Sequence, residues 1–505
     1  MNIHSPRSFF GSFHIAALSL LFVFGTLIRL YDLTDLPLDF HPTRQLFSAL
    51  KARGMYYQSL PDAPEEQRQF AIQQGKMRPT IEPEILEKLT VFTWKFTGER
   101  LWVARIYSSI FWLIVGIFLY LLARDLFSRD GALFATAFYL LLPYGVFASR
   151  SFQPDPLMTA SAFIGIYFLY RWSESLSPNS HLATPTSQSW KFAILASAFI
   201  GFAVFVKIFI GFIAGGAAVA IVLFTLKGKF WRSPQVWTMA AIMGIPAFLF
   251  YFTGDRGNST EYITNWSLGM LKLITSTDFY SRWLSFLGSL FGLTILFLSL
   301  AGTLLAAPRG RALLIGLWTG YLLYGLSVPF QMYTHSYYHI QLTPIIALGL
   351  SPLIETVTSR IGREKRVWQA ALVALTVAVV GYHSWVARSV LIAEDFRAEP
   401  AYWQTVGEAI PANADVIALA QDYGYRLMYY GWRRVDLWPL ASGLAEVRGN
   451  TINTEKTFAE MAAGKDYFLV TSFNQLDKQP DLKKILDGYP IAAQGDGYVL
   501  YDLRK

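Results

Sequence analysis

The sequence contains no cysteine, and only 15% of its 505 residues are charged. The absence of cysteine excludes disulfides, thiolate metal sites and covalent thiol chemistry. Soluble proteins carry about 25% charged residues, so the low charge argues against a soluble protein. The chain also lacks a P-loop, a glycine-rich dinucleotide fingerprint and a nucleophile elbow. Nothing in the sequence therefore indicates an ATP-driven pump.

Long apolar runs are abundant instead. Hydrophobic residues make up 53% of the chain, in runs such as IFWLIVGIFLYLLA and LLIGLWTGYLLYGLSV, which have the length that a hydrocarbon layer about 30 Å thick requires. The 15 Trp and 27 Tyr fit the aromatic belts of bilayer interfaces. The sequence predicts a polytopic α-helical membrane protein with about eleven spans, which are Phe13–Leu30, Leu101–Ala123, Leu133–Phe147, Leu157–Arg171, Phe192–Val206, Phe209–Leu226, Val236–Phe252, Trp283–Ala306, Ala312–Val328, Ile340–Val357 and Trp368–Val390.

The basic loops indicate how the chain is oriented in the plasma membrane. With the N-terminus in the cytoplasm, RDLFSRD, KGKFWR, APRGR and SRIGREKR all lie inside, as the positive-inside rule favours. The net charge of +8 has the same explanation, so it does not indicate a nucleic-acid partner. The first apolar run has no small-residue cleavage site, so we expect a retained span. An odd number of spans then places the C-terminus outside.

Two large segments lie outside in this arrangement. In residues 31–100, PTRQLFSALKARGMYYQSL and EPEILEKLTVFTWKF have the apolar spacing of amphipathic helices in the membrane interface. A loosely folded loop is the alternative. Residues 393–505 have a soluble composition, in which ADVIALA, KDYFLVTS and GYVLYDL are typical of strands and YRLMYYGW and KTFAEMAAG of helices. We expect a transmembrane domain over 1–392 and a small extracytoplasmic α/β domain after it.

Polar residues of the kind that carry chemistry gather on the outer face in the same arrangement. Asp39, in LPLDFHPTRQ, follows the first span, where a carboxylate meets both headgroups and water and suits a general base. His41 and Arg44 are close enough in sequence to orient it or balance its charge. Asp39 as a cap of the following helix is the alternative, since Asp and Pro are common at helix starts.

Asp155 and Lys207 are the next candidates. Asp155 lies in SRSFQPDPLMTA between the third and fourth spans, where Arg150 can supply an opposite charge, and an N-cap of the fourth span is the alternative. Lys207, in FAVFVKIFIGF, has apolar residues on both sides. It either binds an anion such as a phosphate or extends its amine to the interface.

The segment PFQMYTHSYYHIQLTPIIAL joins the ninth and tenth spans. Its His335, Tyr337, Tyr338 and His339 offer hydrogen-bond groups and flat faces that suit sugar or phosphate recognition. An aromatic interfacial belt is the alternative for the tyrosines. The two histidines are four apart, so on a helix they would share a face as metal ligands do. No acid accompanies them locally, so the metal stays unassigned and a divalent cation stays open.

This arrangement resembles the C-type (GT-C) glycosyltransferases over about residues 10–390. The resemblance is carried by LPLDFHPTRQ, RSFQPDPLMTA, FVKIFIGF and HSYYHIQLTPIIAL. The most similar groups are the dolichyl-phosphate-mannose protein mannosyltransferases and the lipid A aminoarabinose transferase, which use a polyprenyl-phosphate sugar donor. The resemblance implies a GT-C fold with about eleven transmembrane helices, interfacial helices in the first outer loop and a small C-terminal extracytoplasmic α/β domain.

The resemblance also implies roles for individual residues. Asp39 matches the family's first-loop acid, the candidate catalytic base, and Asp155 matches the second acidic position. Glu82, in TIEPEIL, resembles the acidic or His residue before a Pro in the interfacial helices. Many relatives carry Asp-Glu in the first loop, where this chain has Phe after Asp39, which puts an acid-pair mechanism in doubt. The relatives' basic residue beside the EP position is missing, so Arg78 or Lys76 is expected to bind the phosphate instead.

We therefore expect an inverting glycosyltransferase that moves a sugar from a polyprenyl-phosphate donor to a lipid, protein or glycan acceptor at the outer face. Lys207, Arg78 or Arg150 would stabilise the leaving phosphate, and Asp39 would accept the acceptor's proton. No cofactor is implied with certainty. One alternative is a transporter or flippase of lipid-linked saccharides, which predicts charges along a path across the bilayer. Another is a non-catalytic assembly protein.

Overall fold

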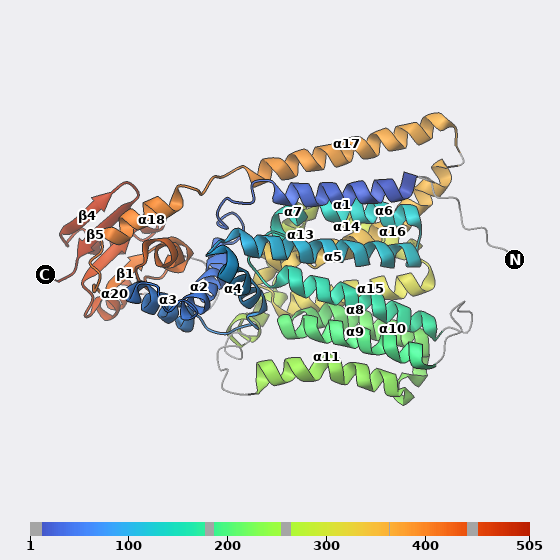
Figure 1. Ribbon diagram of the computed structural model, residues 1–505, viewed down its shortest axis with the longest axis horizontal. Coiled ribbons are helices and arrows are strands. Elements are labelled where there is room, and N and C mark those ends of the chain that lie inside the picture. Colours follow the sequence, from blue (N-terminus) through green and yellow to red (C-terminus); the bar gives the residue numbers. More distant parts are fainter. Residues whose placement is uncertain (1–12, 177–185, 254–263, 363, 442–452, 505) are drawn as a thin grey trace. The chain divides into compact units, whose positions relative to one another are not determined.

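The chain forms two compact units in the computed structural model, whose ribbon is shown in Figure 1. The structure describes residues 13–176, 186–253, 264–362, 364–441 and 453–504. The first unit comprises Met1–Leu33, Thr80–Leu86 and Ala104–Ala393, and the second comprises Thr34–Pro79, Glu87–Val103 and Glu394–Lys505. The second unit thus takes in much of the predicted outer loop as well as the predicted C-terminal domain.

The first unit is helical throughout its described part. Apolar runs of this length form helices because a bilayer offers no water to satisfy an open backbone. Its α-helices are α1 His14–Leu30, α5 Trp102–Leu126, α6 Arg129–Leu141, α7 Pro143–Ala148, α8 Asp155–Ser175, α9 Thr186–Val206, α10 Ile210–Leu226, α11 Pro234–Phe252, α13 Thr277–Phe291, α14 Leu293–Leu305, α15 Pro308–Ser327, α16 Leu342–Ile361 and α17 Arg366–Leu391. Short 3-10 helices are η2 Lys227–Arg232, η3 Leu268–Thr275, η4 Gln331–Tyr333 and η5 Ser336–His339.

Close packing of small residues holds the helices of this unit together. Helix α10 packs along α15, and α8 packs along α9. A Cβ added at Gly216 of α10 would collide with the backbone oxygen of Gly316, and one added at Gly320 of α15 would collide with the backbone of Phe212. Only glycine allows the two backbones to approach this closely, as is common between membrane helices.

Six helices among the described residues are long and apolar enough to cross a membrane, or seven if a bent pair counts as one span. The chain is therefore an integral membrane protein, but the predicted count of about eleven spans is not confirmed. One reason is that the predicted span Leu133–Phe147 is interrupted. Helix α6 ends at Leu141 and α7 begins at Pro143, because proline lacks an N–H group and its ring clashes with the preceding turn.

The predicted span Trp283–Ala306 is not one continuous helix. Helices α13 and α14 meet there at an angle of 95°. The break falls at Gly292, whose φ of 80° lies in the left-handed region that favours glycine. The pair of spans predicted on either side of Lys207 is confirmed as two separate helices, α9 and α10.

The second unit contains a five-stranded sheet with the order β2-β1-β3-β5-β4. Strand β1 is parallel to β2 and β3, and β5 is antiparallel to β3 and β4. Fully buried apolar strands such as β1 and β3 supply the core side chains Ile417, Leu419, Phe468 and Val470. The strands are β1 Val416–Leu419, β2 Asp436–Leu437, β3 Tyr467–Val470, β4 Ile491–Gly495 and β5 Tyr498–Asp502, and the helices beside them are α18 Glu399–Glu408, α20 Thr454–Ala462, α21 Phe473–Leu476 and α22 Pro480–Leu486.

The three strands predicted in this region are confirmed as β1, β3 and β5, and the helix predicted at KTFAEMAAG is confirmed as α20. Strands β2 and β4 were not predicted. Strand β2 has two residues, and β4, with the sequence IAAQG, has no buried position. The segment YRLMYYGW contains a single π-helical turn, η7 Leu427–Gly431, which follows the 3-10 turn η6 Gln421–Gly424.

The outer-loop part of the second unit is helical, as predicted, rather than a loose loop. Its helices are α2 Pro42–Gln58, α3 Glu65–Met77 and α4 Ile85–Thr97, of which α3 was not predicted. Phe92 and Phe96 on α4 are 61% and 77% exposed, which suits a helix that rests in a lipid interface. Its placement in the interface stays a prediction.

A buried arginine holds these loop helices to the C-terminal part of the second unit. Arg53 of α2 donates from Nε to Glu99 Oε1 at 2.7 Å, and it also donates to the backbone oxygen of Tyr429. Its guanidinium lies 3.5 Å from the ring centroid of Tyr429 and 4.5 Å from that of Trp432. Burial of Tyr429 raises the pKa of its phenol, so it remains neutral. Arg53 thus joins three segments that are far apart in sequence.

Replacing Arg53 with Met is expected to leave the largely buried Glu99 carboxylate without its cation, at a cost of about 3–5 kcal/mol. The melting temperature of the purified protein should fall, and residues 34–103 should become more sensitive to protease. Lys456→Met is the matched control, since Lys456 and Glu460 form an ion pair whose side chains are 75% and 67% exposed, and such pairs contribute about 0.5 kcal/mol. Equal effects of the two substitutions would contradict this role for Arg53.

Candidate active site

The candidate site in the first unit is built on Lys207. The lysine follows the last residue of α9, and its amine is buried where α9 gives way to α10. Its Nζ lies 2.9 Å from Asp155 Oδ1 and 3.6 Å from Glu82 Oε1. The Lys207 side chain is 6% exposed, so it does not extend to the interface as the alternative required. It forms an ion pair with two carboxylates that sequence analysis had also singled out.

The backbone explains why Asp155 reaches this lysine. Asp155 is the first residue of α8, between Pro154 and Pro156, and no side chain caps that helix end. The N-cap alternative for Asp155 is therefore not what the structure has. A carboxylate in the first turn of a helix is stabilised by the positive end of the helix dipole. The turn directs this carboxylate to Lys207.

Aromatic rings complete the cluster from a fourth segment. The Lys207 amine lies 5.1 Å from the ring centroid of Tyr337 and 4.9 Å from that of Tyr338. An ammonium at such distances is attracted by the negative face of a ring. Tyr338 in turn stacks on Tyr324 of α15, with centroids 6.1 Å apart and planes inclined by 11°. Both tyrosines therefore belong to the cluster around Lys207.

The two predicted histidines support this aromatic segment. His339 donates from Nε2 to the Met332 oxygen at 3.0 Å, so its Nδ1 accepts from the Tyr321 hydroxyl at 2.6 Å. The ring of His335 packs edge-on against Tyr337 and Tyr338. Burial and, second, the Lys207 charge lower the pKa of His335 to about 4, so the ring is neutral near pH 7.

The residues of this cluster do not fit a metal ion. The two histidines flank a 3-10 turn and not an α-helix, and both nitrogens of His339 hold hydrogen bonds within the protein. Among the described residues, no three His, Asp or Glu side chains gather where a metal could bind. The Lys207 amine itself lies between the carboxylates of Asp155 and Glu82, where a bridging cation would lie. No step is therefore assigned to a metal here.

Arg150 lies near Asp155 in sequence and is 2% exposed. Its Nη2 donates to the Asp32 oxygen at 2.9 Å. It thus ties the α7–α8 connection to the segment after α1. Its predicted role in phosphate binding stays a prediction.

Two supporting residues were missed by sequence analysis. Arg29 of α1 is fully buried, and it donates to Ser149 Oγ at 2.9 Å and to the Leu140 oxygen at 3.0 Å. It thereby satisfies a carbonyl at the break between α6 and α7. Tyr144 of α7 donates to the Ser336 oxygen at 2.6 Å, which fixes the start of η5. An arginine inside the apolar run GTLIRLYDL was the available signal for Arg29.

The remaining predicted residues, Asp39, His41, Arg44 and Arg78, belong to the second unit. Asp39 is half-buried and accepts a long contact of 3.5 Å from Gln45 Nε2. His41, with a φ of 50°, is the residue before α2. Asp39 therefore does not cap that helix, and the cap alternative is wrong. That Asp39 shares a pocket with Asp155 stays a prediction.

The other two cations of this group lie among aromatic rings. Arg44 lies 5.4 Å from the ring centroid of Phe47, and Arg78 lies 4.8 Å from that of Tyr425. Arg78 also donates to Gln74 Oε1 at 3.1 Å. The start of α2 is tied to the C-terminal region by a bond of 3.0 Å from Thr43 Oγ1 to Asp422 Oδ1. The sheet domain is therefore attached to the loop that carries Asp39.

Comparison with known proteins agrees with this architecture. The family model for dolichyl-phosphate-mannose-protein mannosyltransferase matches residues 89–252. The structure matches ArnT from Cupriavidus metallidurans bound to undecaprenyl phosphate, with a TM-score of 0.58 and 14% identity over 97% of both chains. The comparison with curated proteins gave no match.

Two other matches extend the likeness. The archaeal oligosaccharyltransferase AglB from Archaeoglobus fulgidus, in complex with an inhibitory peptide and a dolichol-phosphate, matches with a TM-score of 0.53 and 12% identity over 98% of this chain and 74% of that one. The arabinofuranosyltransferase AftD from Mycobacteria matches with a TM-score of 0.54 and 15% identity over 96% of this chain and 40% of that one. The fold is that of the GT-C membrane glycosyltransferases, which confirms the predicted fold class. Within that class, the family model that matches is the mannosyltransferase model.

Proposed function

We propose that this protein is an inverting glycosyltransferase that takes a sugar from a polyprenyl-phosphate donor and transfers it at the outer face of the plasma membrane. The observation that carries the proposal is the cluster of Lys207, Asp155 and Glu82, buried at the ends of spans in a GT-C fold. Buried charges are costly in a membrane and mark functional sites. The match to ArnT bound to undecaprenyl phosphate supports a donor of that chemistry.

One part of the donor suits the bilayer and another part suits this cluster. Its polyprenyl tail dissolves among the lipid chains, and its phosphate lies at the ends of the spans. The Lys207 ammonium carries three N–H groups and lies against the carboxylates of Asp155 and Glu82. Its positive charge attracts the anionic phosphate of the donor as a point charge. Tyr337 and Tyr338, which lie against the same amine, offer flat faces and hydroxyls to the sugar.

The reaction exchanges one bond at the anomeric carbon. The acceptor oxygen forms a bond to this carbon from the face opposite the phosphate, and the bond between carbon and phosphate oxygen breaks with its electron pair. Asp39 accepts the proton of the acceptor hydroxyl. Lys207, Arg78 or Arg150 stabilises the charge that develops on the leaving phosphate. Because phosphate leaves readily, the step requires no general acid. The C-terminal domain positions the acceptor.

The experiment is a transfer assay with purified protein in vesicles. Short-chain polyprenyl phosphates that carry different sugars would be supplied with lipid, peptide and glycan acceptors. The expected product has the opposite anomeric configuration to the donor, measured by NMR coupling constants, and heat-inactivated protein is the control. Retention of configuration would overturn the inverting mechanism. Movement of the donor across the vesicle membrane without any transfer product would identify a transporter instead.

A further inference from the structure

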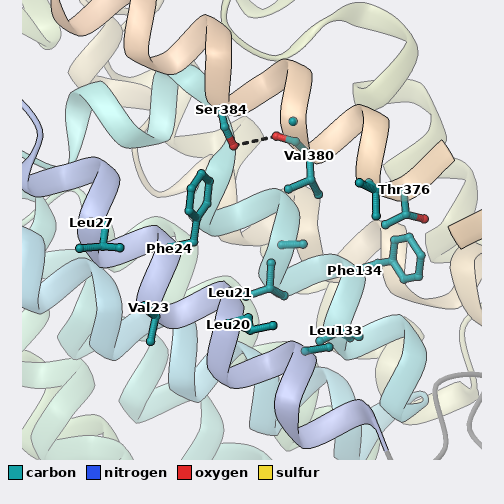
Figure 2. Close-up of a pocket in the computed structure, with 14 residues that line it drawn as sticks. Leu20, Leu21, Val23, Phe24, Leu27, Leu133, Phe134, Thr376, Val380 and Ser384 are labelled. Atoms are coloured by element: carbon teal, nitrogen blue, oxygen red, sulfur yellow. Dashed lines mark hydrogen bonds between the residues drawn. The ribbon is translucent and has the colours of Figure 1, made fainter. Parts of the chain in front are cut away.

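An apolar groove lies within the first unit, away from the Lys207 cluster. It is bounded by α1, α6 and α17, and Figure 2 shows the side chains that line it. The groove has a volume of about 630 Å³, within the range of about 300–1,000 Å³ that small-molecule sites span. Its α1 wall includes Leu20, Val23 and Leu27, which are 67%, 56% and 58% exposed. These side chains therefore have little of the protein packed against them.

The groove offers water no partner. Its two hydroxyl groups, on Thr376 and Ser384, are turned back onto the carbonyls of α17. Thr376 donates to the Leu372 oxygen at 2.8 Å, and Ser384 donates to the Val380 oxygen at 2.7 Å. The other lining side chains are hydrocarbon or absent. Apolar cavities of this kind do not hold ordered water, so between membrane spans the groove takes up hydrocarbon chains.

The positively charged side chain of Arg388 lies at one end of this groove. Leu27 on α1 and Ser384 on α17 are lining residues, and one helical turn further along the same faces are Tyr31 and Arg388. The Arg388 guanidinium lies 5.3 Å from the ring centroid of Tyr31. Arg388 is exposed, and its guanidinium also lies 5.7 Å from the ring centroid of Trp385. A hydrocarbon groove thus ends at a cation.

We propose that the groove is a site for one membrane phospholipid. An acyl chain lies between α1, α6 and α17, and the phosphate of the headgroup lies against Arg388. The cation at one end of the groove attracts a charged headgroup, and the apolar walls along the rest accommodate an acyl chain. The groove therefore favours a phospholipid over an uncharged lipid. Helix α17 makes few contacts with α1. Only 6% of the most apolar stretch of α17 is buried in the protein. The bound lipid would therefore hold this helix in place.

A glycine in the groove allows a sharp test. Gly381 lines the groove, and a Cβ added there would meet no atom within 4 Å. Gly381→Phe is therefore expected to place a ring in the groove without a clash at Cβ. Phenylalanine also has a higher helix propensity than glycine. Gly244→Phe in α11 is the matched control. A Cβ there also meets no atom within 4 Å, on an exposed position outside the groove.

Each variant would be reconstituted in vesicles of phosphatidylethanolamine and phosphatidylglycerol, re-extracted in mild detergent, and analysed by native mass spectrometry. We expect wild type and Gly244→Phe to retain one phospholipid, and Gly381→Phe to retain at least about tenfold less. Arg388→Gln should retain about fivefold less phosphatidylglycerol than wild type. One basic residue near the membrane surface raises the affinity for an anionic headgroup by about that factor.

Three results would overturn the proposal. The first is that wild type retains no phospholipid after reconstitution. The second is that Gly381→Phe retains as much as Gly244→Phe, with both eluting as folded protein. The third is that wild type extracted directly from cell membranes and analysed in the same way carries a polyprenyl phosphate instead, which would make the groove part of the donor route. The proposal is independent of sugar transfer, so failure of the transfer assay leaves these outcomes unchanged.

Discussion

Replacing Asp39 with Asn is expected to lower the rate of sugar transfer by about 10²- to 10⁴-fold, the range that a general base contributes. An amide has nearly the shape of a carboxylate, but it cannot accept the proton of the attacking hydroxyl. The contact between Asp39 and Gln45 can be kept by the amide oxygen, so folding should change little. The measurement is the initial rate with a polyprenyl-phosphate sugar at saturating acceptor.

Two companion variants separate this role from a structural one. Asp39→Glu keeps a carboxylate and should recover part of the lost rate. Asp62→Asn removes an exposed acid from the turn between α2 and α3 of the same unit and should leave the rate unchanged. A variant Asp39→Asn that keeps more than about a tenth of the rate would contradict a general base.

Residues that break an apolar pattern were the part of the site that sequence could predict. Lys207 stands alone among apolar neighbours, and Asp155 lies between two prolines at a helix start. Each is anomalous by itself, because charge is costly at membrane depth. Helices and strands in which apolar residues recur at a regular spacing were also predicted correctly. Long apolar runs and buried strands such as β3 leave the chain few alternative structures.

The pairing of these residues could not be predicted, because it depends on contacts across the whole unit. Glu82 and Lys207 are separated by several helices, yet their charged atoms lie 3.6 Å apart. Arg29 and Tyr144 donate hydrogen bonds to backbone carbonyls. Every residue has such a carbonyl, so the sequence does not indicate which one is bound. The bend at Gly292 was missed because a single glycine inside an apolar run is usually tolerated in a helix. Its φ of 80° lies in the left-handed region, which glycine adopts readily.

Replacing Lys207 with Met is the second large effect that we expect. The substitution leaves two carboxylates, with side chains that are 1% and 13% exposed, without their cation. Loss of one partner from a buried ion pair costs about 3–5 kcal/mol. The melting temperature should therefore fall. Because the proposed role of the Lys207 charge is to attract the donor phosphate, the KM for the donor should also rise, whereas the KM for the acceptor should stay the same.

The double variant Lys207→Met with Asp155→Asn separates stability from binding. Removing the nearer carboxylate, whose Oδ1 lies 2.9 Å from the amine, also removes most of the uncompensated charge, so part of the lost stability should return. Donor binding should not return, because the phosphate still lacks its cation. Lys207→Arg, which keeps the charge, should bind the donor better than Lys207→Met. If the double variant recovers both the melting temperature and the donor KM, Lys207 serves only to neutralise Asp155 and the phosphate is held by other residues.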